Sequence, residues 1–83
     1  MDLSVIIPCL NEQDTLSICI NKCIKSFDKS NIKGEVIIAD NGSTDGSIEI
    51  AKKLGVKIVN VKEKGYGNAL IKGIESSSGK YII

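Results

Sequence analysis

Residues 5–16 read VIIPCLNEQDTL, a stretch that begins as an apolar strand and ends as the start of a helix. Pro8 closes the apolar run, because its ring fixes φ and removes a backbone donor. The turn between the two elements, residues 8–12, contains no glycine. A loop built to bring backbone amides against a pyrophosphate would carry glycines at this point. The stretch therefore predicts a strand-to-helix turn that offers side chains and carbonyls, rather than bare amides, to a ligand.

The residues after this turn repeat apolar side chains at intervals of three and four, which is typical of a helix with one buried face. We expect Asn11 or Asp14 to cap the amino end of this helix. Glu12, like Asp14, would suit the positive end of the helix dipole. The predicted buried stripe consists of Leu16, Cys19, Ile20, Cys23, Ile24 and Phe27.

The same alternation continues along the rest of the chain. Further strands are predicted at 35–40, 56–61 and 80–83, and further helices at 47–55 and 68–79. We expect Ser43 or Thr44 to cap the first of these helices. This β-α-β-α-β-α-β order predicts an α/β fold with a doubly wound parallel sheet, in a single domain. The predicted buried side of the last helix carries Ala69, Leu70, Gly73 and Ile74.

The composition is that of one small globular domain and argues against several functions. The 83 residues carry a net charge of +1, which gives no footprint for nucleic acid or an anionic membrane surface. No apolar run reaches the roughly 20 residues of a membrane span, and no basic leader precedes the first strand. Three cysteines without CxxC spacing, and no histidine, argue against a disulfide framework or a metal centre. We therefore expect a reduced, cytoplasmic protein.

Polar side chains gather in the loops that follow the predicted strands. Ligands of open parallel sheets bind beyond the carboxyl ends of the strands, and three loops lie there, at 8–12, 40–46 and 62–67. Asp40 ends the second strand, where an ionised carboxylate can accept from a base N–H or a ribose hydroxyl. The alternative is that Asp40 caps its own turn through backbone amides. The sequence leaves both interpretations open.

Other polar residues of these loops also carry two interpretations. Glu12 can contact a ligand, or only sit in the first helical turn. Asn11 is more typical of a helix cap, and Asp45 of a stabilising residue at a helix start, than of a ligand contact. Lys64, next to a Gly-x-Gly segment, can pair with a phosphate, although an exposed lysine is more often only solvated. The dinucleotide fingerprint and the Walker loop are both absent.

Three blocks of the sequence resemble one family. VIIPCLNEQDTL (5–16), EVIIADNGSTDGS (35–47) and KGYGNALIKGIESSSGKYII (64–83) are similar, in order and spacing, to the N-terminal half of the catalytic domain of the family 2 inverting nucleotide-sugar glycosyltransferases. The resemblance covers essentially the whole chain and looks closest to the polyprenyl-phosphate (dolichyl-phosphate) sugar synthases. It implies a Rossmann-like parallel sheet, the nucleotide-binding half of a GT-A domain.

The resemblance implies a function and a site. The function is transfer of a sugar from a nucleoside-diphosphate sugar to an acceptor such as polyprenyl phosphate. In the family, the first loop and the end of the second strand grip the nucleoside. The usual Asp-Asp-Gly-Ser of the family is Asp40-Asn41-Gly-Ser here, so only the first acid is kept. Carried over by position, the pocket consists of Pro8, Leu10, Asn11, Glu12, Ile38 and Asp40.

The resemblance also implies what lies outside this chain. In the family, a strand that starts like GKYII runs into an Asp-x-Asp motif that holds Mg²⁺ or Mn²⁺ on the diphosphate, and the catalytic base follows further on. The sequence ends at Ile83, before either. We therefore expect residues 1–83 to be a truncated nucleotide-sugar-binding domain that is inactive alone. In its full-length form we expect a cytoplasmic protein peripheral to the membrane.

The alternative is a non-catalytic small α/β module that binds nucleotides or a protein. Such a module could pair with a second copy through an open sheet edge. The sequence favours the transferase, because the three blocks occur together in the family's order. A receiver-like or flavodoxin-like domain ranks lower, because its acidic pair would stand where this chain has Pro8 and Cys9.

Overall fold

The computed structural model of the chain describes residues 2–62, 65–77, 79 and 81–82. Within these residues, four parallel strands form one sheet in the order β3-β2-β1-β4. The predicted α/β fold and its order of elements are confirmed. The strands are β1 (Leu3–Cys9), β2 (Gly34–Asp40), β3 (Lys57–Asn60) and β4 (Tyr81–Ile82), and the helices are α1 (Leu16–Ser30), α2 (Ser47–Lys53) and α3 (Tyr66–Glu75).

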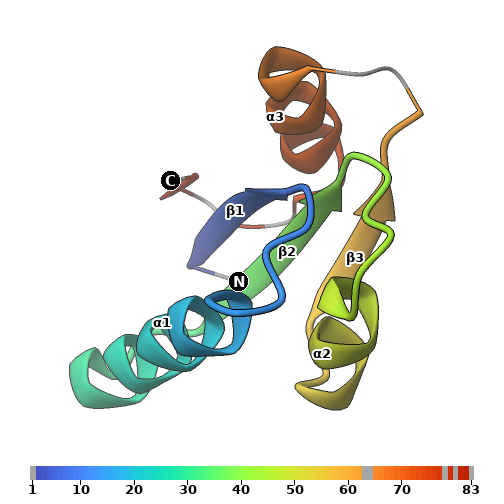
Figure 1. The fold of residues 1–83 in the computed structure, drawn as a ribbon. Coiled ribbons are helices and arrows are strands. Elements are labelled where there is room, and N and C mark those ends of the chain that lie inside the picture. Colours follow the sequence, from blue (N-terminus) through green and yellow to red (C-terminus); the bar gives the residue numbers. More distant parts are fainter. Residues whose placement is uncertain (1, 63–64, 78, 80, 83) are drawn as a thin grey trace.

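Helices cover both faces of the sheet. Helix α3 lies on one face, and α1 and α2 lie on the other (Figure 1). Strand β1 pairs with β2 along its whole length, from Leu3 opposite Gly34 to Cys9 opposite Asp40. On its other side β1 pairs with β4 through Leu3 and Ser4. The strand order therefore reverses at β1, and in doubly wound sheets a ligand crevice opens at the carboxyl end of such a reversal.

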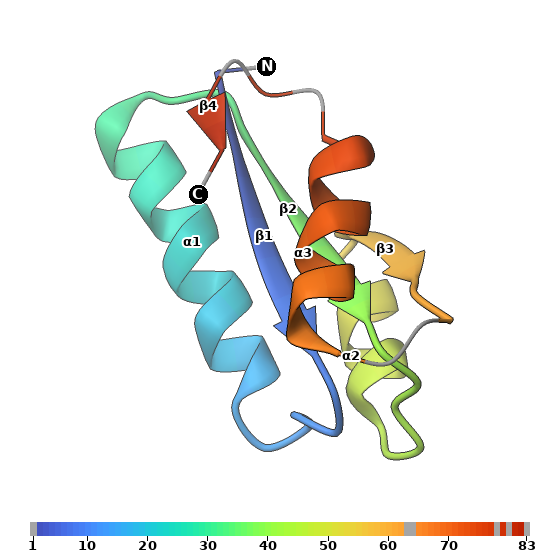
Figure 2. The ribbon, with the colours of Figure 1, turned by 90° about the horizontal axis from the view of Figure 1, so that it is seen from above.

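Two apolar clusters, one on each face, hold the layers together. Successive residues of β2 point to opposite faces, and both faces are covered, so its apolar run shows no polar alternation. Figure 2 shows β1 and β2 side by side beneath α3, with the loops that follow them at the same end. The cluster towards α1 and α2 contains Cys9, Leu16, Ile20, Phe27, Val36, Ile38 and Ala51. The cluster towards α3 contains Ile6, Ile37, Ala39, Val61 and Ala69.

The predicted stripe of α1 is buried only along its middle. Leu16, Ile20 and Phe27 are buried, as expected, but Cys19 is exposed. A stripe with both three- and four-residue spacings covers a wide arc of the helix. The sheet reaches only the centre of that arc, so residues at its margin remain in contact with solvent.

Helix α3 differs from its prediction in position and in one face residue. It spans Tyr66–Glu75 rather than 68–79. Ile74, expected to be buried, is 48% exposed. The reason is that Gly73 faces the sheet, where an added Cβ would meet Cγ2 of Ile6. Within the part of the chain that the structure describes, none of the helices has the length and apolarity that crossing a bilayer requires.

Candidate functional site

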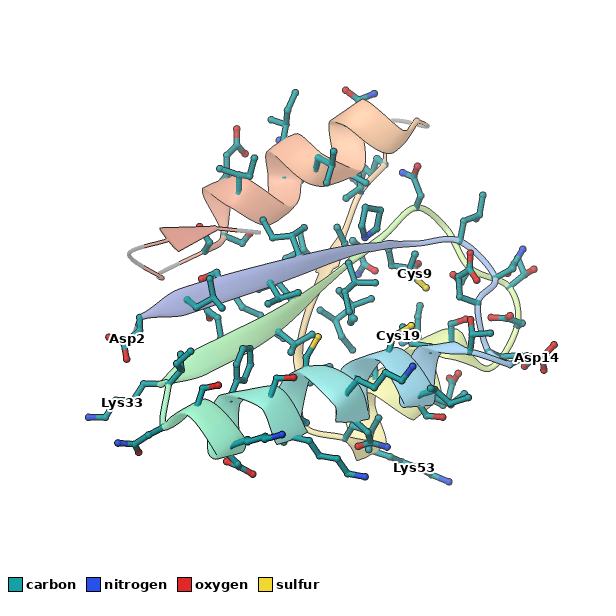
Figure 3. All side chains as sticks on the ribbon, turned by 90° about the vertical axis from the view of Figure 1, so that its left-hand side faces the viewer. Asp2, Cys9, Asp14, Cys19, Lys33 and Lys53 are labelled. Carbon is teal, nitrogen blue, oxygen red and sulfur yellow. The ribbon has the colours of Figure 1, made fainter. Side chains whose placement is uncertain are left out.

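The loops that follow β1 and β2 meet at one edge of the sheet. We call residues 10–15 the first loop and residues 41–46 the second loop. Cys9 and Asp40, the last residues of the two strands, are partners in the parallel ladder, so both loops start at the same level. Figure 3 shows Cys9 and Asp14 at the same end of the molecule. The structure thus brings together the first two of the three loops that the sequence analysis singled out.

Backbone amides of each loop are bound by side chains of the other. Asn11 Oδ1 accepts from the amides of Thr44 at 2.8 Å and Asp45 at 3.3 Å. In the opposite direction, the amide of Glu12 donates to Ser47 Oγ at 2.9 Å. The two loops therefore hold each other in place through side chains rather than through a strand ladder.

Three further bonds complete this exchange. The amide of Asn11 donates to Ser43 Oγ at 2.9 Å, and the amide of Gln13 donates to Asp45 Oδ2 at 3.1 Å. The amide of Gly46 donates to Gln13 Oε1 at 2.8 Å. An anion-binding nest needs backbone N–H groups that point at the ligand. Because these amides are already bound, the paired loops are not arranged as a phosphate cradle.

The structure shows Asp40 in the arrangement that the sequence analysis gave as the alternative. The residue is 2% exposed. Its Oδ2 accepts from the amides of Gly42 at 3.1 Å and Ser43 at 3.0 Å, and its Oδ1 accepts from Ser43 Oγ at 2.5 Å. The carboxylate therefore caps its own turn instead of pointing into the crevice. Ile38 is also buried, at 1% exposure, inside the cluster towards α1.

The other predicted contact residues lie nearer the surface of this edge. The Leu10 side chain is 49% exposed. Glu12 is exposed, and within the described residues its carboxylate is bound only by Thr15 Oγ1, at 3.4 Å. Asn11 is exposed, although its amide oxygen is committed to the second loop, and Pro8 is half-buried. An apolar side chain and an available carboxylate thus stand two residues apart in the first loop.

The helix caps differ from those predicted. Asn11 and Asp14 do not cap α1, and Ser43 and Thr44 do not cap α2; neither helix has a side-chain cap. Asn11 instead adopts the left-handed conformation, with φ of 55°, which aims its amide oxygen at the second loop. The residues whose chemistry suggested helix caps serve mainly to join or shape the loops.

Two titratable groups of this edge are shifted from their ordinary behaviour. Burial raises the pKa of the Cys9 thiol, although hydrogen bonds with Ser43 and Ser47 oppose the effect. The hydrogen bond from the Ser47 hydroxyl, at 2.6 Å, holds the pKa of the Asp45 carboxyl below its usual value. At neutral pH the thiol is therefore protonated and the carboxylate is ionised.

Asn41 connects the third predicted loop to the same edge. It is 7% exposed, its Nδ2 donates to Val61 O at 3.3 Å, and its Oδ1 accepts from the amide of Gly65 at 3.0 Å. Sequence reasoning missed this role, because an Asn-Gly pair is typical of turns in general. Lys64, for which phosphate pairing was the less favoured of two interpretations, lies outside the described residues.

Two hollows lie at the opposite end of the strands. The larger, of about 650 Å³, lies where α1 and α2 end and where β2 and β3 begin. Phe27 and Ile32 line both hollows, and the larger hollow is also lined by Asp28, Lys33, Glu35 and Lys57. We place the candidate site at the loop edge, because ligands of open parallel sheets bind beyond the carboxyl ends of the strands, whereas the hollows lie at the opposite end.

Comparison with known proteins finds relatives over nearly the whole chain. Residues 4–83 match the family model described as Glycosyl transferase family 2. Low-salt glycan biosynthesis hexosyltransferase Agl6 of Haloferax volcanii is 39% identical over 80 residues, which are 96% of this chain and 19% of the relative. Undecaprenyl-phosphate 4-deoxy-4-formamido-L-arabinose transferase of Edwardsiella ictaluri is 33% identical, over 98% of this chain and 27% of the relative.

A solved structure gives the same picture. Glucosyl-3-phosphoglycerate synthase from Mycobacterium tuberculosis, in complex with Mn²⁺, UDP and glucosyl-3-phosphoglycerate, superposes with a TM-score of 0.80 and 28% identity. The match covers 99% of this chain and 32% of that chain. The chain thus spans less than a third of the length of each of these three proteins.

Proposed function

The chain belongs to glycosyl transferase family 2, and from that premise we propose that it forms the nucleoside-binding part of an enzyme that transfers a sugar from a nucleoside-diphosphate sugar to an acceptor. The solved relative that holds UDP supports the nucleotide. The relative named for undecaprenyl phosphate supports a polyprenyl phosphate as the acceptor of the whole protein. These relatives also support a GT-A arrangement around this sheet.

One observation carries the nucleoside assignment. Six backbone amides of the first and second loops donate to side chains across the contact between the two loops. These amides are therefore not available to a ligand. The exposed side chains of the first loop include an acceptor, the Glu12 carboxylate, and the apolar Leu10 side chain two residues away. A nucleoside matches this pair, because it presents a flat base together with hydroxyl and N–H donors, whereas a phosphate presents only acceptors.

The six predicted residues take different roles in this proposal. Leu10 packs against the base, and Glu12 accepts from a ribose hydroxyl. Asn11 holds the first loop in shape, and buried Ile38 supports the edge from below. Asp40 holds the second loop; its direct contact with the base stays a prediction, because the carboxylate would first have to release its own turn amides. Pro8 sets the direction in which the chain leaves β1.

The only support for a divalent cation in the whole protein comes from a relative in the same family. The solved relative contains Mn²⁺ with UDP. Among the residues that the structure describes, no group of three or more His, Cys, Asp or Glu side chains is placed to hold a metal. The residues present do not fit a cation site, so the proposal assigns no step of binding to a metal and rests on the nucleoside alone.

The test is a titration of the chain with uridine, UDP and GDP, followed by amide chemical shifts. We expect shifts at residues 10–15 and 41–47. The dissociation constants should be about 1 mM, which corresponds to a binding free energy of roughly −4 kcal/mol. Uridine should bind about as well as UDP, because most backbone amides of the two loops already have acceptors and are not available to the phosphates. Shifts confined to the hollow near Phe27, or no shifts at millimolar ligand, would overturn the proposal.

Matched variants separate the site from the rest of the surface. Leu10→Ser and Glu12→Gln should each weaken binding of uridine several-fold. The control for Leu10→Ser is Ile18→Ser, which removes an isoleucine on α1 that is 54% exposed. The control for Glu12→Gln is Glu49→Gln, which removes one carboxylate in the first turn of α2. Both controls should leave the affinity unchanged. Equal losses in the controls would show that the shifts report charge or stability rather than a pocket.

The non-catalytic module remains as the second candidate. Strand β4 pairs with β1 only at Leu3 and Ser4, so within the described residues the rest of that β1 edge has no strand partner. Pairing of two copies through this edge stays a prediction. Sedimentation across a range of protein concentrations would test it, since a chain that remains monomeric would contradict pairing.

A further inference from the structure

We propose that Asn41 is a site of spontaneous deamidation that the folded second loop holds in check. The chain has six asparagines, and Asn41 is the only one followed by glycine. Glycine favours the reaction because it has no Cβ to hinder approach of its backbone nitrogen. The same asparagine ties the second loop to the segment after β3. This inference does not depend on the proposed transferase function.

The reaction uses only the chain and water. The backbone nitrogen of Gly42 attacks Cγ of Asn41 and forms a new N–C bond. The Cγ–Nδ2 bond then breaks, and the amide nitrogen leaves as ammonia after taking up the proton that the Gly42 nitrogen has lost. The product is a five-membered succinimide. Water opens this ring at either carbonyl and leaves aspartate, or isoaspartate with one extra carbon in the backbone.

The folded structure opposes each part of this reaction. The attacking nitrogen of Gly42 carries a proton that is hydrogen-bonded to Asp40 Oδ2 at 3.1 Å. The side chain of Asn41 is 7% exposed, and both ends of its amide are bound, by Val61 O and by the amide of Gly65. Because Cγ must rotate towards Gly42 to react, these bonds have to open first. The rate is then set by the population of molecules in which the loop is open.

The product cannot restore the original contacts. Aspartate at position 41 can still accept from Gly65, but it has lost the donor that bonded Val61 O. It also places a second carboxylate directly beside that of Asp40. Isoaspartate lengthens the backbone inside a turn that Asp40 closes through two amides. Each reaction that yields isoaspartate therefore loosens the loop permanently.

The experiment compares deamidation of the whole chain in buffer and in concentrated urea at mildly alkaline pH. Peptide mapping by mass spectrometry locates the mass gain, which also distinguishes deamidation at Asn41 from isomerisation at Asp45-Gly46, where the mass does not change. We expect conversion in urea to be confined at first to Asn41, and to be at least about tenfold slower in buffer. Equal rates in buffer and urea would overturn the proposal.

Two variants test the role of the turn itself. Asp40→Ala frees the Gly42 amide and should speed conversion of Asn41 in buffer several-fold. Asp45→Ala removes the same charge from the same loop but contacts Gln13 and Ser47 instead, so it should change the rate far less. A slower rate in Asp40→Ala would show that the carboxylate assists the attack, and would overturn the proposal.

A third variant covers the case in which Asp40→Ala does not fold, as judged by circular dichroism. Ser43→Ala removes the hydroxyl that donates to Asp40 Oδ1 and accepts from the amide of Asn11, but keeps the Asp40 carboxylate that binds the Gly42 amide. It should accelerate conversion in buffer to a smaller extent. Asn41→Gln gives the background, because the longer side chain would have to close a larger ring. If folded Ser43→Ala converts no faster than the unmodified chain, the turn does not control the reaction and the proposal fails.

Discussion

Asn11 and Asn31 have nearly the same backbone conformation but different structural roles. Both lie in the left-handed region, with φ of 55° and 54°. Asn31 ends α1, where a left-handed residue closes the last turn. Asn11 instead carries an oxygen that binds the amides of Thr44 and Asp45. Asn11 therefore joins two segments that are distant in sequence, whereas Asn31 closes the end of one helix.

This difference predicts a difference in stability. Asn11→Ala and Asn31→Ala should both lose the tolerance of asparagine for the left-handed region, at about 1 kcal/mol each. Only Asn11→Ala also leaves two amides without their acceptor, which should add about 1–2 kcal/mol. Urea unfolding measures both. Equal losses in the two variants would show that the cross-loop bonds contribute nothing to stability.

A second prediction at this scale concerns pH. The Ser47 hydroxyl holds the pKa of the Asp45 carboxyl below its ordinary value of 3.8. The folded state therefore binds this proton less readily than the unfolded chain does. The resulting stability is fully present above the unfolded pKa and is lost as pH falls through the lowered folded pKa. Asp45→Asn should flatten that part of the curve of unfolding free energy against pH, and Asp14→Asn serves as the control.

At the scale of elements, the contact between α3 and the sheet depends on one glycine. Gly73 faces Ile6 of β1, whose Cγ2 occupies the space that a Cβ would need. Gly67, in the same helix, has nothing within 4 Å of the corresponding position. Comparing substitutions at these two glycines separates the effect of helix packing on stability from the effect of helix propensity.

Alanine at these two positions should have opposite effects. Gly67→Ala should stabilise the chain by up to about 1 kcal/mol, because alanine favours the helix. Gly73→Ala gains the same propensity but overpacks Ile6, at about 1–3 kcal/mol, so it should be neutral or destabilising. Adding Ile6→Ala to Gly73→Ala should relieve the overpacking. Thermal unfolding compares the variants, and stabilisation by Gly73→Ala would contradict the close contact.

The elements were predictable where the chain is apolar and less so where it is polar. The run EVIIAD predicted β2 because both of its faces are buried. The roles of Asn11 and Ser43 in joining the two loops could not be predicted, because their partners lie some thirty residues away and local spacing does not indicate them. The same reason explains Asp40: a carboxylate at the end of a strand has one sequence signature for two roles.

At the scale of the whole molecule, Ser4 fastens β4 to the sheet. It is fully buried, donates to Glu35 Oε2 at 2.6 Å, and accepts from the amide of Gly79 at 2.8 Å. Residue 79 lies next to the backbone of Leu3 and Ser4, where an added Cβ would collide. The last strand is therefore joined to the first through a single hydroxyl together with the pairing of two residues.

This predicts that Ser4→Ala acts far beyond its own position. The half-buried amide of Gly79 would lose its acceptor, at about 1 kcal/mol. The amides of β4 should then exchange with solvent faster while those of β2 keep their protection. Hydrogen exchange followed by NMR measures the protection of the β4 amides and of the β2 amides separately. Ser26→Ala, an exposed change on α1, is the control, and uniform loss of protection in Ser4→Ala would contradict a local fastening.

The exchange of bonds between the two loops constrains how this edge can be re-engineered. Each loop relies on the other for several of its acceptors, so a transplant of one alone into another scaffold would carry unsatisfied amides with it. Insertions in either loop would shift the register of acceptors in the other. Directed evolution of this rim should therefore succeed when residues 10–15 and 41–47 are randomised jointly, and stall when they are varied one at a time.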